Sequence, residues 1–166
     1  NLGTSEWFIS NFGLADLAAG ALVALFVRQI VERIGNRSMI GIGLAGTGLS
    51  ALLIATTHNL NITLLASAIG GASWMLVSVG QFAYFSEMTP MEHKQSYTTA
   101  YHQVVFLSMF IGPLIGRLLS SDSMPIVSVL LIGALLRLLA AMLIQIHPRE
   151  WMSRAFHTAF SARSHS

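Results

Sequence analysis

The sequence lacks cysteine altogether and contains few charged residues. Among its 166 residues there is no cysteine, and the charged types together make up 10%, whereas soluble domains carry about a quarter. Without cysteine the chain can form neither a disulfide framework nor a thiolate metal site. The net charge is only +2, and the basic residues are scattered, so we predict no phosphate-binding stripe and no nucleic-acid partner.

Hydrophobic residues, in contrast, make up 54% of the chain. They form long runs, and the charged residues gather where those runs stop. The stretch from Arg28 to Arg37 separates apolar residues 12–27 from apolar residues 39–56. Each run approaches the roughly 20 residues that cross hydrocarbon as a helix, where buried charge is expensive. We therefore predict an integral membrane protein in which this stretch turns one helix back into the bilayer.

The predicted fold class is all-α, a polytopic membrane helix bundle with five transmembrane helices. Residues 1–11 are expected to form an extracytoplasmic loop, residues 12–148 the membrane bundle and residues 149–166 a cytoplasmic tail. The tail has an amphipathic pattern that suits a helix on the membrane surface, but its short length suits disorder nearly as well. The helices are predicted at residues 12–31, 39–57, 62–85, 97–119 and 126–146.

The distribution of lysine and arginine predicts the orientation, because cytoplasmic loops retain these residues. Only Arg117 falls near the opposite face from the other loop and tail residues. The C-terminus is therefore predicted to be cytoplasmic, and five crossings place the N-terminal segment outside. This arrangement is natural if a preceding helix is missing. The basic residues on the predicted cytoplasmic side are Arg28, Arg33, Arg37, Lys94, Arg149, Arg154 and Arg163.

Small and polar residues follow helical spacing on two of the predicted helices. The second helix carries the pairs Gly43 with Thr47 and Gly46 with Ser50, which favour close helix packing and not a phosphate loop, since no strand precedes them and no lysine follows. On the third helix one face carries polar, small and aromatic residues, and two interpretations remain open: a face on a cavity, or tight packing. That face consists of Ser67, Gly71, Trp74, Ser78, Gln81 and Phe85.

Asp16, His102 and Arg137 are ionisable side chains that fall within the predicted helices. Asp16 is either an interfacial carboxylate near a helix N-terminus or a proton or ion site. His102 is either a proton relay or a hydrogen-bonded histidine near a helix end. Both are candidates for proton coupling. Arg137 is expected to pair with protein groups or to extend towards a headgroup.

The sequence offers no arrangement typical of an enzyme. No nucleophile, base or carboxylate pair is spaced for catalysis, and the histidines share no helix face at metal-ligand spacing. No metal, no cofactor and no enzymatic activity are therefore predicted. The histidines are His58, His93, His102, His147, His157 and His165.

The charged loop resembles a known signature. Residues Glu32-Arg33-Ile34-Gly35-Asn36-Arg37 resemble the second copy of the motif that major facilitator superfamily transporters carry between helices eight and nine. Arg28 stands where that motif begins with glycine, Glu32 replaces aspartate and Asn36 replaces a basic residue. Two further stretches resemble the family's link between helices ten and eleven and its kinked helix eleven: Glu87, Pro90, Lys94 and Tyr97, and Gly112-Pro113 with Gly116.

The resemblance implies helices eight to twelve of the C-terminal six-helix half. The missing N-terminal half would be a partner, together with membrane lipids, and the expected location is the cell membrane with the C-terminus cytoplasmic. The family performs secondary active transport by alternating access. The residues expected to line the substrate cavity are Trp74, Ser78, Gln81, Tyr101 and Ser108. They carry no fixed charge, which suits a neutral or amphipathic small molecule.

The resemblance also implies a cytoplasmic gating loop. Glu32 is expected to meet the N-terminus of the helix at residues 97–99, and Arg33 or Arg37 to pair with Glu87. Such contacts form either a latch that breaks and reforms or a structural bracket. The loop comprises Glu32, Arg33, Gly35, Arg37 and Glu87. The alternative function is a transport-inactive scaffold or receptor with the same fold.

Overall fold

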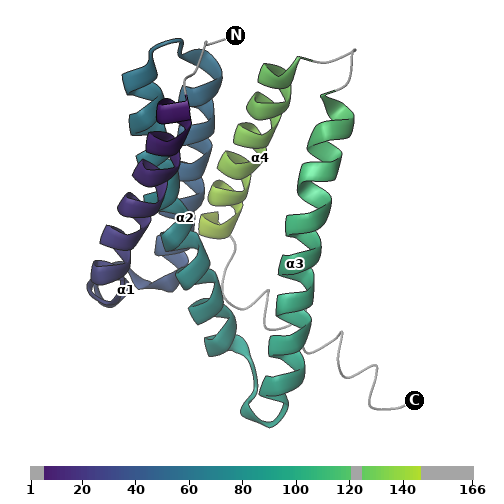
Figure 1. Ribbon diagram of the computed structural model, residues 1–166. Coiled ribbons are helices and arrows are strands. Elements are labelled where there is room, and N and C mark those ends of the chain that lie inside the picture. The colour runs from purple at the N-terminus through teal and green to yellow at the C-terminus, as the bar shows by residue number, and fades with distance from the viewer. Residues whose placement is uncertain (1–5, 121–124, 147–166) are drawn as a thin grey trace.

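The computed structural model describes residues 6–120 and 125–146, and this part of the chain is helical with no strand (Figure 1). The all-α class is thus confirmed. Four helices are long and apolar enough to cross a membrane by length and composition. A short 3-10 turn, η1 (Met91–His93), precedes the third. The helices are α1 (Glu6–Thr56), α2 (Leu60–Met88), α3 (Lys94–Leu119) and α4 (Ile126–Ile146).

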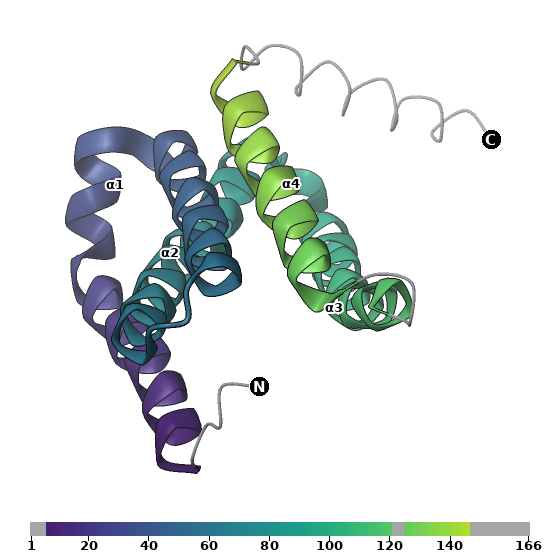
Figure 2. The ribbon, with the colours of Figure 1, turned by 90° about the horizontal axis from the view of Figure 1, so that it is seen from above.

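Helix α1 folds back on itself at Gly35. This residue has φ 77° and ψ 158°, whereas its neighbours are helical. A positive φ is open to glycine without steric cost because glycine has no Cβ. The first segment of α1 (residues 6–34) and the second segment (residues 36–56) therefore run in opposite directions (Figures 1 and 2). The turn lies inside the charged stretch, as the sequence predicts, and the five crossings that depend on it stay a prediction.

Helix α2 packs against both segments of α1. Its N-terminus is capped by Asn59, whose side chain accepts a hydrogen bond from the backbone N–H of Asn61 at 2.9 Å, as short polar side chains do at helix starts. Ser50 in the second segment donates to the carbonyl of Ala66 at 2.7 Å. A Cβ atom placed on Gly43 would lie 2.8 Å from the carbonyl of Ser73. Gly43 therefore allows close packing of the two helices, as the sequence predicts.

Helix α4 packs against the second segment of α1 on the side away from the first segment. A Cβ on Gly48 would lie 3.2 Å from the carbonyl of Ala134 and 3.0 Å from Leu138 Cγ. Near the other end of the contact, Arg37 Nε donates to the carbonyl of Ile144. The two helices run antiparallel, because increasing numbers on one meet decreasing numbers on the other.

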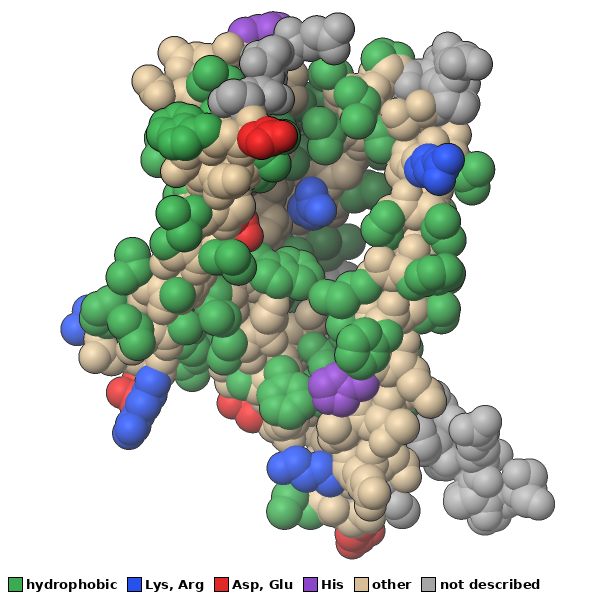
Figure 3. Space-filling view, in the orientation of Figure 1, with side chains coloured by type: hydrophobic (Ala, Val, Ile, Leu, Met, Phe, Trp, Pro, Cys, Tyr) green, Lys and Arg blue, Asp and Glu red, His purple; other side chains and the backbone are tan. Residues whose placement is uncertain are grey.

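Helix α3 stands apart from this packed group (Figures 1 and 2). Tyr97 is its only buried residue, and Pro113 lies within it. Its apolar side chains, including Phe106 and Phe110, are largely exposed. Hydrophobic side chains cover much of the face seen in Figure 3, and charged side chains gather mainly near its lower end. Such a surface suits lipid or further protein.

The helix bounds differ from the sequence prediction chiefly at the N-terminal end. Helix α1 begins at Glu6, so residues 6–11, for which the sequence predicts a loop, are helical. Asp16 therefore lies ten residues into the helix and not near its N-terminus. The remainder of the predicted loop, residues 1–5, and the predicted tail, residues 149–166, lie outside the described residues.

Candidate functional site

The polar face of α2 divides into a packed part and an open part. Ser67 is 2% exposed, and its hydroxyl donates to the carbonyl of Phe12 at 2.7 Å. Gly71 is likewise buried against α1. The packing interpretation therefore holds for these two residues. Further along the same face, Trp74 is 53% exposed, Gln81 is exposed and Ser78 is half-buried.

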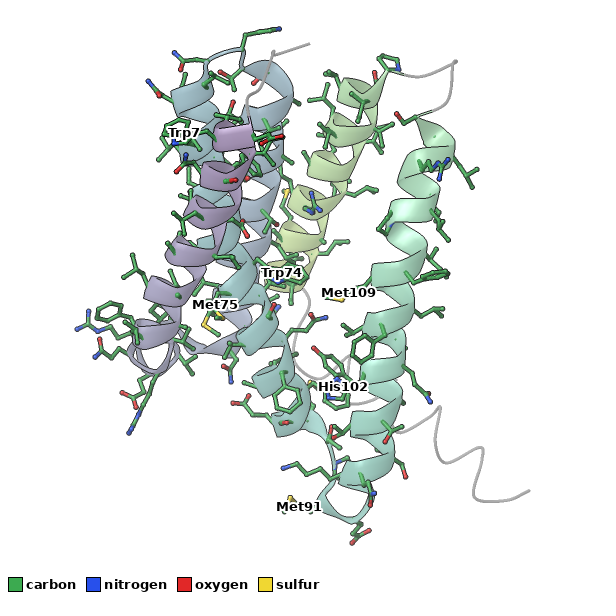
Figure 4. The ribbon with its side chains drawn as sticks, in the orientation of Figure 1. Trp7, Trp74, Met75, Met91, His102 and Met109 are labelled. Carbon is green, nitrogen blue, oxygen red and sulfur yellow. The ribbon has the colours of Figure 1, made fainter. Side chains whose placement is uncertain are left out.

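The open part of α2 lies opposite α3. In Figure 4, Trp74 projects from α2, and His102 and Met109 project from α3, into the space between these helices. Ser108 lies two turns from Tyr101, so it shares that side of α3. Its hydroxyl, however, donates to the carbonyl of Val104 at 2.8 Å. A hydroxyl with that bond already made has less capacity for a ligand than the sequence suggests.

The contact between α2 and α3 is a cluster of aromatic rings near the charged end of the molecule. Phe85 and Tyr101 stack with ring centroids 4.7 Å apart, and Phe82 lies 6.1 Å from Tyr101. His102 lies 6.2 Å from Phe82 and 6.3 Å from Phe106. We call these five residues the aromatic cluster. Each favourable ring pair contributes about 0.5–1.5 kcal/mol beyond its burial, so the cluster can hold α3 to the bundle.

Tyr101, His102 and Phe85 are candidates from the sequence, whereas Phe82 and Phe106 are not. A signal for them was present: aromatic residues stand one to four turns before and after the same short link at residues 89–93. Consecutive helices joined by a short link are antiparallel neighbours. Aromatic residues at similar distances on either side of such a link therefore tend to meet.

The charged turn of α1 meets the C-terminal end of α2 through a residue that is not among the predicted contacts. Asn36 Nδ2 donates to Glu87 Oε1 at 2.6 Å. Glu32 does not extend to α3: it pairs with Arg28 at 2.9 Å on the exposed surface of α1. Arg33 is also exposed. A pair spaced i, i+4 on one helix face forms locally, which explains why Glu32 stays on α1.

Two buried polar atoms near this contact lack a hydrogen-bond partner within the described structure. They are Asn36 Oδ1 and the Tyr84 hydroxyl oxygen, and both residues are 8% exposed. Tyr84 shares a face of α2 with Gly80, which meets the carbonyl of Asn36. A buried polar group without a partner costs about 1–3 kcal/mol. These two atoms mark the part of the junction whose polar groups are not all satisfied by the described residues.

Asp16 lies in the contact between the first segment of α1 and α2. A Cβ on Gly70 would lie 3.6 Å from Asp16 Oδ1 and 2.9 Å from Ser50 Oγ. The carboxylate therefore faces α2 at the level where all three helical segments converge, and the residue is half-buried. Arg137 is exposed on α4, near the middle of that helix. Within residues 6–120 and 125–146, no group of three His, Cys, Asp or Glu side chains is placed to hold a metal ion.

Comparison with known proteins gives concordant matches. The model of the family described as "Major Facilitator Superfamily" matches residues 1–158. The quinolone resistance protein NorA of Staphylococcus aureus (strain Mu50) is 27% identical over 127 residues, covering 70% of this chain and 32% of NorA. The major facilitator superfamily multidrug transporter mfsB of Aspergillus fumigatus is 28% identical over 111 residues, covering 67% of this chain and 18% of mfsB. The chain thus spans about a third or less of these relatives.

Proposed function

The chain belongs to the Major Facilitator Superfamily, and on that premise we propose that it forms helices eight to twelve of a secondary active transporter working by alternating access. It is an integral membrane protein of a family of transporters and not of enzymes. In this proposal the two segments of α1 are helices eight and nine, and α2, α3 and α4 are helices ten to twelve. The missing N-terminal half completes the cavity.

The observation that carries the proposal is the uncovered side of α2 and α3. Trp74 is 53% exposed although it lies in the middle of an apolar helix, and Gln81 is exposed about two turns further on. On the same face of α2, Ser67 and Gly71 are packed against α1. Polar groups in a membrane bundle face protein or water and not lipid. A cavity between two halves gives Trp74 and Gln81 such surroundings.

We propose a small organic molecule with an aromatic part, neutral or amphipathic, as the substrate. Trp74, Gln81 and Tyr101 offer ring faces and hydrogen bonds but no fixed charge, and Ser78 and Ser108 add hydroxyl groups. An aromatic substrate can stack on the exposed rings. The relatives are named for quinolone resistance and multidrug transport, so a quinolone is the first compound to test.

We propose that Asn36 and Glu87 form the cytoplasmic latch. Their 2.6 Å hydrogen bond joins the turn of α1 to the end of α2. Helix α3 follows directly through η1, so opening this bond frees the link that leads into the aromatic cluster. In this arrangement the latch lies on the cytoplasmic side of the cell membrane, together with Arg33, Arg37 and the C-terminus.

Counterflow in proteoliposomes tests the proposal. We would express the longest product of the coding region that contains this chain and measure exchange of a radiolabelled quinolone without any ion gradient. Trp74→Ala should lower apparent substrate affinity about tenfold, since a lost stacking contact of about 1.4 kcal/mol corresponds to that factor. Gln81→Ala should weaken exchange as well.

Two matched controls separate substrate contact from general damage. Trp7→Ala removes a tryptophan that is 71% exposed at the start of α1. Gln103→Ala removes an exposed glutamine from α3, about 200° around the helix from Tyr101. Both should leave exchange unchanged. Exchange that is equally weak in controls and cavity variants would contradict the cavity, and a folded wild type without exchange of any organic compound would favour the scaffold alternative.

A further inference from the structure

Arg137 is the only charged residue of α4 (Ile126–Ile146). Residues 126–136 of the helix precede it and residues 138–146 follow it, which places it about 17 Å and about 14 Å from the two helix ends. An arginine side chain is shorter than either distance, so the guanidinium cannot extend to a headgroup at either end of α4. A charge at that depth needs protein or water around it.

Arg137 lies on the side of α4 that is turned away from the exposed apolar stripe of this helix. At the centre of that stripe Leu139 is 54% exposed, and two residues of spacing place it about 160° around the helix from Arg137. The other exposed members are Leu135, Leu136, Met142 and Leu143. Ala134 and Ala141, three residues before and four after Arg137, are buried. Arg137 therefore borders the packed side of α4, and it is nevertheless exposed.

Arg137 and Trp74 lie at about the same depth. On the second segment of α1, Gly48 contacts α4 on both sides of Arg137 in the chain. Two residues earlier on that segment, Gly46 contacts Ser73, which precedes Trp74 on α2. Both side chains are exposed. Helix α4 lies between α2 and α3 in the view of Figure 1, and the face seen in Figure 3 is hollowed there and contains a basic side chain.

Arg137 has no acidic partner within residues 6–120 and 125–146. Its guanidinium makes no ion pair or hydrogen bond with these residues, and the nearest comparable group, Arg28, pairs with Glu32 on the surface of α1. A guanidinium presents its N–H donors in a planar fork that matches a carboxylate through two parallel hydrogen bonds. An exposed indole at the same depth offers a ring face for stacking. Together they suit a ligand with an aromatic ring and a carboxylate.

We propose that Arg137 binds the carboxylate of the transported substrate, which is then an amphipathic aromatic acid. The inference rests on the transport function proposed above and names the charged part of its substrate. The ring of the substrate stacks on Trp74, and its carboxylate pairs with Arg137. The same molecule without its charge is bound less tightly, because it leaves the guanidinium without a partner.

Exchange of a matched acid and ester in proteoliposomes tests the charge requirement. We would use the longest product of the coding region that contains this chain, a radiolabelled quinolone carboxylic acid without a basic amine, and its methyl ester. Wild-type protein should have a higher apparent affinity for the acid. Arg137→Gln should lower the apparent affinity for the acid about tenfold or more and leave that for the ester unchanged. Arg137→Lys keeps the charge but not the fork, so it should fall between the two.

The matched control is Arg117→Gln, which makes the same change at an exposed arginine in the last turn of α3. It should leave the ratio of acid to ester exchange unchanged. If Arg137→Gln does not fold, Arg137→Lys provides the same comparison. Equal loss of both substrates in the folded variant overturns the proposal in favour of a pair with a carboxylate of the protein itself. Unchanged exchange of the acid overturns it as well.

Equilibrium binding of the labelled acid in detergent separates this proposal from the proposed function. Binding to wild-type protein that weakens in Arg137→Gln, without any exchange in proteoliposomes, refutes transport and supports the carboxylate site. Exchange of the acid together with binding that is indifferent to residue 137 refutes the carboxylate site and supports transport.

Discussion

At the scale of single residues, Gly35 determines where the chain turns. Its φ of 77° is the only positive φ among the described residues, and a side chain there is strained whatever space surrounds it. Gly35→Ala should destabilise the protein by about 1–3 kcal/mol, measured by denaturant unfolding in detergent micelles.

The matched control for Gly35 is Gly13→Ala. At both positions an added Cβ would meet nothing within 4 Å, but only Gly35 has a positive φ. Gly13→Ala should therefore be neutral or stabilising by up to about 1 kcal/mol, as alanine is in a helix interior. Equal effects of the two substitutions would show that the backbone conformation at Gly35 carries no strain for alanine.

Some features of single residues could be predicted from the sequence and others could not. The position of the turn was predictable because charge is expensive within the bilayer and Gly35 falls inside the charged stretch. The surroundings of Asp16 were not predictable, because they depend on Gly70 and Ser50, which reach it only through the packing of three segments. The role of Asn36 was hidden for the same reason, since the resemblance implies a pair of Arg33 or Arg37 with Glu87 and no contact for Asn36.

At the scale of helices, the latch joins the turn of α1 to the end of α2. Glu87→Ala should remove the acceptor for Asn36. A hydrogen bond to a charged group contributes about 1.5–3 kcal/mol when buried, and less at the exposed Glu87. A loss of about 1 kcal/mol shifts a two-state equilibrium about fivefold. The rate of maleimide labelling of Gln81→Cys from the cytoplasmic side should rise accordingly, because the cavity opens to that side more often.

Glu32→Ala is the control for the latch variant. Glu32 pairs with Arg28 on the exposed surface of one helix, and such i, i+4 pairs contribute only about 0.3–0.5 kcal/mol. The labelling rate at residue 81 should therefore stay close to wild type. This chain has no cysteine, so it contributes no background labelling. An unchanged rate in Glu87→Ala would identify the contact as a fixed structural bracket.

The aromatic cluster should contribute measurably to the attachment of α3. Phe85 and Tyr101 stack at 4.7 Å, and a double-mutant cycle with Phe85→Ala and Tyr101→Ala should give a coupling of about 0.5–1.5 kcal/mol in unfolding experiments. A parallel cycle with Phe110→Ala in place of Phe85→Ala should give none, because Phe110 is 69% exposed and lies nine residues from Tyr101. Zero coupling in the first cycle would contradict the cluster.

The positions of the helices could largely be predicted from the sequence, whereas the contacts between the helices could not. The long apolar runs marked α2, α3 and α4 to within a few residues, because hydrocarbon thickness sets the length of such runs. The start of α1 was misjudged because Glu6 and Asn11 suggested a polar loop, although Trp7, Phe8 and Ile9 extend the helix. The pairing of Phe82 with Tyr101 required knowing which helix faces meet.

At the scale of the whole molecule, the arrangement of the helices brings both charged loops to one end. Asn36 and Glu87 are 51 residues apart in the chain and bonded to each other, whereas the link at residues 57–59 lies at the far end of α2. If lysine and arginine determine the orientation, the charged end is cytoplasmic and the link is outside. Cysteine substitutions on the full product can decide this with a membrane-impermeant maleimide.

Met91→Cys and His58→Cys form a matched pair, because both residues are exposed and lie in links at opposite ends of α2. On intact cells His58→Cys should be labelled and Met91→Cys should not, whereas inverted membrane vesicles should give the reverse. Glu87 lies four residues from Met91, so the side on which Met91→Cys is labelled is also the side of the proposed latch. The latch is cytoplasmic only with this orientation. Labelling of Met91→Cys on intact cells would invert the bundle and place the Asn36–Glu87 contact at the extracytoplasmic mouth of the transporter.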